Sequence, residues 1–331
     1  MVQQERVQIL ENAPPLDLRA LRWLLRGLVT ESERPSSIGK LIRGAVLVPV
    51  FGLFLILATV RAWLRRPVER IAVLEDGSRI RCRLPDLVQM YIYIFGYWEP
   101  DLTDYIRNHL REGDTFVDVG ANVGYFSLLA SPIVGKSGGV VAIEASPRIN
   151  RMLEENIRRS DAGNVRATNI AAAAEAGTLD VYSGPDHNIG LTTTVKGRGL
   201  PVEQSIEALP LGEILTDQEV ARAKLVKIDV EGGEGEVLAG LTSFLQRCPE
   251  DVEILVELSP KWWDNPDRLP VDVLKPMVEA GFNIYEMDNN YWPWRYLWPR
   301  RIRRPRRVRR RLTKRVFRLD LVLSRKDVEE L

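Results

Sequence analysis

Cysteine and histidine are scarce in this chain of 331 residues, which contains two of each. Cys82 and Cys248 lie far apart in the sequence, and no C-x-x-C pair occurs. The sequence therefore excludes a disulfide framework, gives no support for a zinc site and fits a reducing compartment. A chain of this length is sufficient for one sizeable hydrophobic core with additional segments.

Acidic residues are absent from 300–318, where twelve residues are basic. Removing these twelve charges from the net charge of +1 leaves −11 for the rest of the chain. Basicity thus belongs to one segment, and the body of the protein is acidic. Aromatic residues precede the basic run directly: Tyr291, Trp292, Trp294, Tyr296 and Trp298.

This insertion at 291–318 has three interpretations. Tryptophan, tyrosine and arginine together are typical of contact with an anionic membrane surface. Basic and aromatic residues also suit RNA, through phosphate contacts and base stacking. The third interpretation is a solvated loop. We favour the membrane, because a second segment points the same way.

That second segment lacks charge from Gly44 to Val60. Seventeen helical residues span about 26 Å, and four more bring the length to about 31 Å, close to a hydrocarbon core of about 30 Å. We expect 44–60 to associate with a membrane, either spanning it or lying on it; the alternative is a buried core helix. Before it, Leu18, Leu21, Leu25 and Leu28 recur at helical spacing among arginines. Residues 1–67 are therefore expected to hold an amphipathic helix and a membrane-associating segment.

The rest of the chain predicts an α/β fold. Residues 68–112 are expected to form a hairpin, turning at Asp76-Gly77, and a helical lead-in. From 113 to 331 apolar runs alternate with helical stretches, which indicates a mostly parallel sheet covered on both faces. The apolar runs are 115–120, 139–146, 165–171, 223–230, 252–259, 282–288 and 319–324. Extra short strands are expected between the third and the fourth of these runs.

A glycine-rich loop, "DVGANVG" at 118–124, follows the first of these runs. It departs from the dinucleotide pattern G-x-G-x-x-G, because Asn122 stands in place of a glycine and Asp118 adds a negative charge. At about 4 Å and an effective dielectric of about 20, like charges repel by about 4 kcal/mol, which disfavours a pyrophosphate. The same carboxylate suits a cationic ligand, and S-adenosylmethionine is a cationic adenosine derivative without phosphate.

Glu144 ends the next run, at the position where a carboxylate accepts hydrogen bonds from both ribose hydroxyls. Ribose is common to NAD and S-adenosylmethionine, so Glu144 alone does not discriminate between them. With the loop, it predicts a cofactor site rather than a plain strand–turn–helix corner.

The chain resembles the FkbM family of S-adenosylmethionine-dependent methyltransferases over roughly residues 90–325. The resemblance lies in "GYWEPDLT" (96–103), "GDTFVDVGANVGYFSLLAS" (113–131), "GVVAIEASP" (139–147), "NVRATNIAAAAEAGTLDVYS" (164–183), "LVKIDVEGGEGEVLAGL" (225–241) and "ILVELSP" (254–260). One departure is "EASP" at 144–147, where the family more often has E-P-x-P. The apolar segment 44–60 and the insertion 291–318 lie outside the family core.

The resemblance implies a class I methyltransferase (Rossmann-like) fold, with seven strands in the order 3-2-1-4-5-7-6 and the last strand antiparallel. It also implies methyl transfer, usually to a hydroxyl oxygen. The residues expected to bind the cofactor are Glu99, Asp118, Gly120, Asn122, Gly124, Glu144, Asn169 and Asp229.

Methylation of a hydroxyl requires a base, since an aliphatic hydroxyl is a poor nucleophile. Asp229 and Glu231 follow the fourth run, where Asp229 is expected to orient cofactor or acceptor and Glu231 is either catalytic or a cap of the next helix. His187, between the third and fourth runs, is a candidate base or an exposed loop residue. Glu257, ending the fifth run, is a further catalytic candidate. No spacing demands a metal ion, so none is predicted.

These observations predict an O-methyltransferase acting on a small molecule, sugar or lipid-linked acceptor. It is expected at a membrane, with the catalytic domain facing the cytoplasm because S-adenosylmethionine is cytosolic. One alternative is an RNA methyltransferase that uses the arginine run, although an N-P-P-[YF] loop is missing. The other is a non-catalytic, membrane-anchored module that binds the cofactor.

Overall fold

The computed structural model describes most of the chain. The described residues are 37–63, 68–265, 267–290, 302–310 and 316–331, with Leu21, Arg22, Leu25, Trp292, Arg295, Tyr296, Leu312 and Thr313. Leu18 and Leu28 of the expected amphipathic helix lie outside them, as do Tyr291, Trp294 and Trp298.

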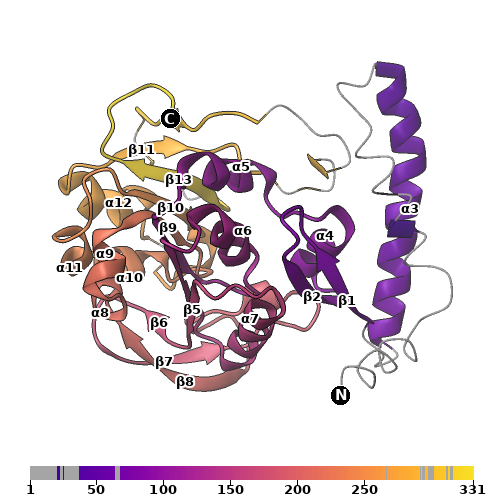
Figure 1. The fold of residues 1–331 in the computed structure, drawn as a ribbon, viewed down its shortest axis with the longest axis horizontal. Helices are drawn as coiled ribbons and strands as arrows, with labels where there is room; N and C mark the ends of the chain where they lie inside the picture. Colours follow the sequence, from indigo (N-terminus) through magenta and orange to yellow (C-terminus); the bar gives the residue numbers. More distant parts are fainter. Residues whose placement is uncertain are drawn as a thin grey trace.

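A mixed sheet of eight strands forms the centre of the molecule (Figure 1). Its order is β12-β11-β13-β10-β9-β3-β4-β5. The strands from β10 to β5 are parallel, and β13 runs antiparallel to both of its neighbours, β10 and β11. Seven strands were expected, and the eighth is the two-residue β12 at the edge. The strands are β3 (Thr115–Val119), β4 (Gly139–Ile143), β5 (Val165–Thr168), β9 (Ala223–Ile228), β10 (Glu253–Leu258), β11 (Asn283–Glu286), β12 (Arg306–Arg307) and β13 (Leu319–Ser324).

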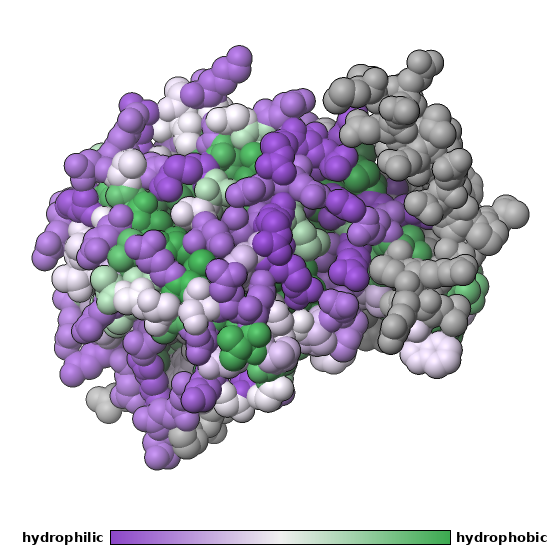
Figure 2. Space-filling view, turned by 90° about the horizontal axis from the view of Figure 1, so that it is seen from below, coloured by the Kyte–Doolittle hydropathy of each residue, from purple (hydrophilic) through white to green (hydrophobic). Residues whose placement is uncertain are grey.

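Helices cover both faces of this sheet. Successive side chains of a strand point to opposite faces, and since apolar side chains point to both, each face carries a hydrophobic core. Phe116, Val140 and Leu225 face one core, with α5, α6 and α7, whereas Val117 and Val141 face the other, with α8–α12. Figure 2 shows a surface on which hydrophilic residues predominate and hydrophobic ones form small groups. The helices are α5 (Pro100–His109), α6 (Tyr125–Val134), α7 (Pro147–Arg159), α8 (Leu211–Ile214), α9 (Asp217–Ala221), α10 (Glu234–Ala239), α11 (Thr242–Leu245) and α12 (Pro270–Glu279).

A second, three-stranded sheet interrupts the chain between β5 and β9, as the sequence predicted. Its order is β6-β8-β7, with β6 (Ala171–Ala172), β7 (Gly177–Tyr182) and β8 (Val202–Leu209). The segment between β7 and β8 contains the short helix η1 (Ile189–Leu191), and η2 (Pro260–Trp262) follows β10. Both short helices contribute to the cavity described below.

The expected hairpin is confirmed. Strands β1 (Val68–Val73) and β2 (Arg79–Leu84) pair antiparallel, and Gly77 takes the left-handed conformation of the turn. Helix α4 (Leu87–Phe95) follows and is buried over most of its length. Figure 1 shows a long helix, α3 (Ser37–Trp63), standing beside this unit.

The prediction of a membrane-associated protein is wrong. Helix α3 packs Leu47, Phe51 and Phe54 into the protein, with exposures of 0%, 7% and 0%. Phe51 contacts the rings of Tyr91 and Phe95. Within the part of the chain that the structure describes, no helix combines the length and the apolar character that a bilayer crossing requires.

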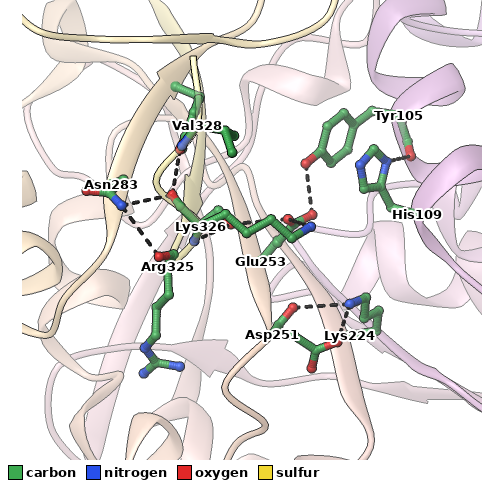
Figure 3. A network of polar contacts seen from close by, with 11 residues as sticks. Tyr105, His109, Lys224, Asp251, Glu253, Asn283, Arg325, Lys326 and Val328 are labelled. Atoms are coloured by element: carbon green, nitrogen blue, oxygen red, sulfur yellow. Dashed lines mark hydrogen bonds and ion pairs between the residues drawn. The ribbon is translucent and has the colours of Figure 1, made fainter. Parts of the chain in front are cut away.

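A polar network ties the sheet together at one end (Figure 3). The buried carboxylate of Glu253, at the start of β10, accepts hydrogen bonds from Tyr105 Oη (2.8 Å), Ser324 Oγ (3.2 Å) and Lys326 Nζ (2.9 Å). It thereby joins α5, β10 and β13. Because β10 ends near Glu257, this network lies at the opposite end of the strand from the candidate site.

The packing of α3 predicts unequal effects of two truncations. Phe54→Ala should lower the free energy of unfolding by about 3–5 kcal/mol, because it leaves a cavity in the core. Ile56→Ala, on the same helix but 61% exposed, should change it by less than about 0.5 kcal/mol. Urea unfolding followed by circular dichroism measures both. Equal effects would show that α3 does not pack on the body as described.

Candidate active site

A cavity of about 1250 Å³ lies at the carboxyl ends of β3, β4, β9 and β10. Loops after these strands, η1, η2 and the segment before β13 form its wall. This is where open parallel sheets bind ligands. The predicted site residues that line it are Glu99, Gly120, Asn122, Glu144, Asp229, Glu231 and Glu257.

The glycine loop between β3 and α6 passes close to the loop after β9. Gly120 has φ +78°, and a Cβ added there would lie 1.9 Å from the carbonyl oxygen of Asp229. Only glycine therefore permits this approach. Asn122 also has positive φ, at 52°. A Cβ at Gly124 would lie 2.6 Å from Leu153 Cδ1, so that glycine serves helix packing and does not line the cavity.

Asp118 does not line the cavity, contrary to the expectation that it faces the ligand. Its carboxylate is fully buried and accepts a hydrogen bond from Ser127 Oγ (2.7 Å). Lys227 Nζ lies 3.7 Å from Asp118 Oδ1 and 3.1 Å from Asp229 Oδ2. Although burial opposes charge on the ammonium, the two carboxylates raise the pKa of Lys227. Asp118 therefore balances the buried positive charge of Lys227. The expected repulsion between Asp118 and a bound pyrophosphate does not apply directly, because this carboxylate does not face the cavity.

Glu144 is held by backbone amides. Its carboxylate accepts hydrogen bonds from Asn122 N (2.8 Å) and Ser146 N (2.9 Å) while it lines the cavity. Burial raises its pKa to about 7. Asn169 does not line the cavity; its Nδ2 donates to the carbonyls of Glu144 (2.8 Å) and Ala145 (3.0 Å), so it fixes the turn after β4.

Acidic side chains gather where β9 and β10 end. Burial raises the pKa of Glu231 to about 8, reinforced by Asp229 and Glu234. Burial and the same neighbour, Asp229, also raise the pKa of Glu257. The helix after Glu231, α10, has Gly233 as its N-cap residue and no side-chain cap, so the capping role considered for Glu231 is not observed.

His187 is not brought into this group. It is exposed and does not line the cavity, and its carbonyl accepts a hydrogen bond from Leu87 N (3.2 Å). The adjacent Asn188 lines the cavity.

Sequence reasoning missed several residues that build the site. Lys227 was detectable as a charge inside the apolar run "LVKIDV". Arg318 and Asp320 lie at the start of β13; Arg318 is 3.5 Å from Glu257 Oε2 and 3.0 Å from Asp320 Oδ2. No local motif signals them, because their partners are distant in the sequence.

Of the two aromatic residues that the structure describes between 291 and 298, Tyr296 packs against the body, whereas Trp292 is 69% exposed. The ring of Tyr296 is buried against Tyr91, Phe95 and Tyr97. Its hydroxyl accepts a hydrogen bond from Glu99 N (3.0 Å). Glu99 itself has φ 44°, an unusual conformation for a residue with a side chain. The insertion thus helps to position a residue of the cavity.

Acidic partners surround the described arginines of the insertion. Between residues 303 and 310, five arginines form ion pairs: Arg303–Asp288, Arg306–Glu330, Arg307–Asp327, Arg309–Glu329 and Arg310–Glu286. Their positive charge is therefore largely balanced locally. Arg304 lines the cavity and has no such pair with another described residue.

Comparison with known proteins gives consistent matches. The sequence profile of the methyltransferase FkbM domain matches residues 118–284, about half of the chain. The hexuronic acid methyltransferase AglP of Haloferax volcanii is 30% identical over 183 residues, which are 55% of this chain and 69% of that protein. A protein-L-isoaspartate O-methyltransferase of Caenorhabditis elegans is 36% identical over 67 residues, 20% of this chain, and the chain spans 30% of its length. Among solved structures, TYW2 of M. jannaschii in complex with AdoMet aligns with a TM-score of 0.38 at 16% identity, covering 77% of this chain and 84% of that one.

The raised carboxyl pKa values predict a stability that falls with pH. In the folded chain Glu99, Glu144, Glu231 and Glu234 have pKa values of about 7 to 8, against an ordinary 4.5. Their protonated forms stabilise the fold fully below pH 4.5, and this contribution is lost as the pH rises through 8. The free energy of unfolding should be lower at pH 9 than at pH 6.

Glu231→Gln, which cannot ionise, should reduce that difference by about 1–3 kcal/mol. The matched control is Glu207→Gln on the exposed side of β8, which should leave it unchanged. Urea titrations at both pH values measure the effect. A stability that rises between pH 6 and pH 9 would contradict the assignment.

Proposed function

Because the chain belongs to the FkbM methyltransferase domain family, it is an S-adenosylmethionine-dependent methyltransferase, and we propose that it methylates a hydroxyl oxygen of a small polar acceptor such as an acidic sugar. The family expected from the motifs is confirmed. The identity of the acceptor and the roles of individual residues are proposals, which the following features of the cavity support.

The cofactor site fits the residues present. Gly120 lets the loop after β3 approach the loop after β9 so closely that a methyl side chain would collide with it. Glu144 is fixed by two backbone amides and has carboxylate lone pairs left for the two ribose hydroxyls. When bound, S-adenosylmethionine supplies a methyl group on a positively charged sulfur. The acidic cavity wall favours a ligand with that charge.

The single observation that supports hydroxyl methylation best is the placement of Glu231 and Glu257 on the cavity wall beside Asp229. A hydroxyl must lose its proton as it attacks, and a base works best when its pKa lies near the working pH. Burial brings the pKa of Glu231 to about 8. We assign proton removal to Glu231 and orientation of the acceptor to Asp229 and Glu257.

An acidic sugar would find cationic groups on the cavity wall. Arg304 lines the cavity without an acidic partner among the described residues, so its guanidinium is free to bind a carboxylate. Trp262 also lines the cavity, and two cationic side chains lie over its ring, Arg198 at 3.9 Å and Lys261 at 4.6 Å. The relative AglP is a hexuronic acid methyltransferase by name, which agrees with this choice.

Methylation of RNA is less well supported, because the ion pairs described above balance five arginines of the insertion. A module that binds the cofactor without turnover would have no need of a group with a pKa near neutrality on the cavity wall. Transfer of a tritiated methyl group to hexuronic acids, neutral sugars and total RNA distinguishes these functions.

Two substitutions test the assignment. Glu231→Gln should lower kcat by about 10²–10⁴-fold, with little change in S-adenosylhomocysteine affinity, and the rate of the unaltered chain should rise with pH through about 8. Arg304→Ala should raise KM for hexuronic acids and leave neutral sugars unaffected. Glu236→Gln, on the rim and paired with Arg268, is the matched control for Glu231. Undiminished turnover in Glu231→Gln, or label in RNA only, would refute the proposal.

A further inference from the structure

Three carboxylates from separate segments converge beside the main cavity. Glu99, Glu257 and Asp320 each offer an oxygen, and these oxygens lie within 4.8 Å of one another. Glu99 precedes α5, Glu257 lies in β10 and Asp320 lies in β13. Glu99 and Asp320 fall outside the region 118–284 that the family profile matches. We propose that these residues bind a hard divalent cation of the Mg²⁺ or Mn²⁺ class.

A separate small cavity supports an ion at this point. It has a volume of about 20 Å³, which is enough for one water molecule or ion. All three carboxylates line it, as does Asn289. The cavity shares Glu99, Glu257 and Asp320 with the wall of the large one, so an ion here would lie next to the bound acceptor.

Unsatisfied oxygens point to a missing partner. Glu99 is 3% exposed, and no hydrogen bond or ion pair of its carboxylate is found among the described residues. Asn289 is 6% exposed; its Nδ2 donates to Asp320 Oδ1 (2.8 Å), and its Oδ1 is buried without a hydrogen-bond partner in the described part of the chain. Buried polar atoms are rarely left unpaired. A cation would satisfy Asn289 Oδ1 and would also pair with the carboxylate of Glu99.

The local charge has the sign and size that a divalent cation balances. The small cavity has four carboxylates on its wall: Glu99, Asp229, Glu257 and Asp320. Two cationic side chains, Lys227 and Arg318, form ion pairs with them. With all four carboxylates ionised, which a bound cation favours, four negative and two positive charges leave −2, and Lys227 is also shared with Asp118.

The donor set selects the class of ion. Carboxylate and amide oxygens suit Mg²⁺ and Mn²⁺, whereas zinc and copper sites usually include histidine or cysteine. Neither histidine of the chain lines either cavity. No local spacing signals the site, because its ligands come from three segments far apart in the sequence. If the proposed function holds, the ion would also bind acceptor hydroxyls and make them more acidic.

Manganese binding tests the inference directly. The purified full chain, stripped with EDTA and dialysed, is titrated with Mn²⁺ while electron paramagnetic resonance measures free Mn²⁺. We expect one bound Mn²⁺ per chain, displaced by Mg²⁺. Glu99→Gln and Glu257→Gln should each weaken binding at least tenfold. Glu236 lines the large cavity but not the small one. The control variant Glu236→Gln should therefore bind Mn²⁺ as tightly as the unaltered chain does.

Thermal unfolding of each variant separates loss of the site from loss of the fold. The inference is overturned if the unaltered chain binds no Mn²⁺ at millimolar concentration, or if both Glu99→Gln and Glu257→Gln bind it normally. Calorimetry with S-adenosylhomocysteine on the same EDTA-treated protein keeps the two proposals apart. Normal uptake of this compound without Mn²⁺ binding refutes only the cation site, whereas Mn²⁺ binding without its uptake refutes only the proposed function.

Discussion

The ammonium group of Lys227 lies in the interior between the carboxylates of Asp118 and Asp229. All three side chains belong to neighbouring strands or to the loop just beyond them. A buried charge without a partner is costly, so each of the three makes the other two tolerable. The pairing also fixes the ends of β3 and β9 relative to one another, and the contact of Gly120 with the Asp229 carbonyl depends on that alignment. The glycine loop and the acidic wall of the cavity are therefore held in place by the same buried charges.

Distant segments complete the site around this unit. Tyr296 accepts a hydrogen bond from the backbone of Glu99, and Arg318 approaches Glu257. Tyr296 and Arg318 both come from the segment before β13, which lies outside the family core. If the proposed function holds, the sheet supplies the cofactor end of the cavity and the segments before β13 shape the acceptor end.

The sequence was sufficient for the α/β class, the hairpin at 68–84 and the glycine loop between β3 and α6, because these depend on local periodicity and turn residues. The sequence did not predict that the Asp118 side chain points away from the cavity. Every residue of β3 is buried, so the hydrophobic pattern does not reveal which face of the sheet a side chain takes. The membrane prediction failed for a related reason. The hydrophobicity of 44–60 is visible in the sequence, but the contact of Phe51 with Tyr91 and Phe95 depends on the tertiary structure. The arginine run was likewise misinterpreted, because its acidic partners lie elsewhere in the chain.

The most direct test of this account is the stability of charge-neutral replacements at the buried unit. Urea unfolding at pH 7 should show that Lys227→Met loses about 3–5 kcal/mol, since two carboxylates are left buried without their cation. Adding Asp118→Asn and Asp229→Asn to that variant should restore most of the loss. If Lys227→Met is as stable as the unaltered chain, or if the triple variant is no more stable than the single one, the buried unit does not hold the site together.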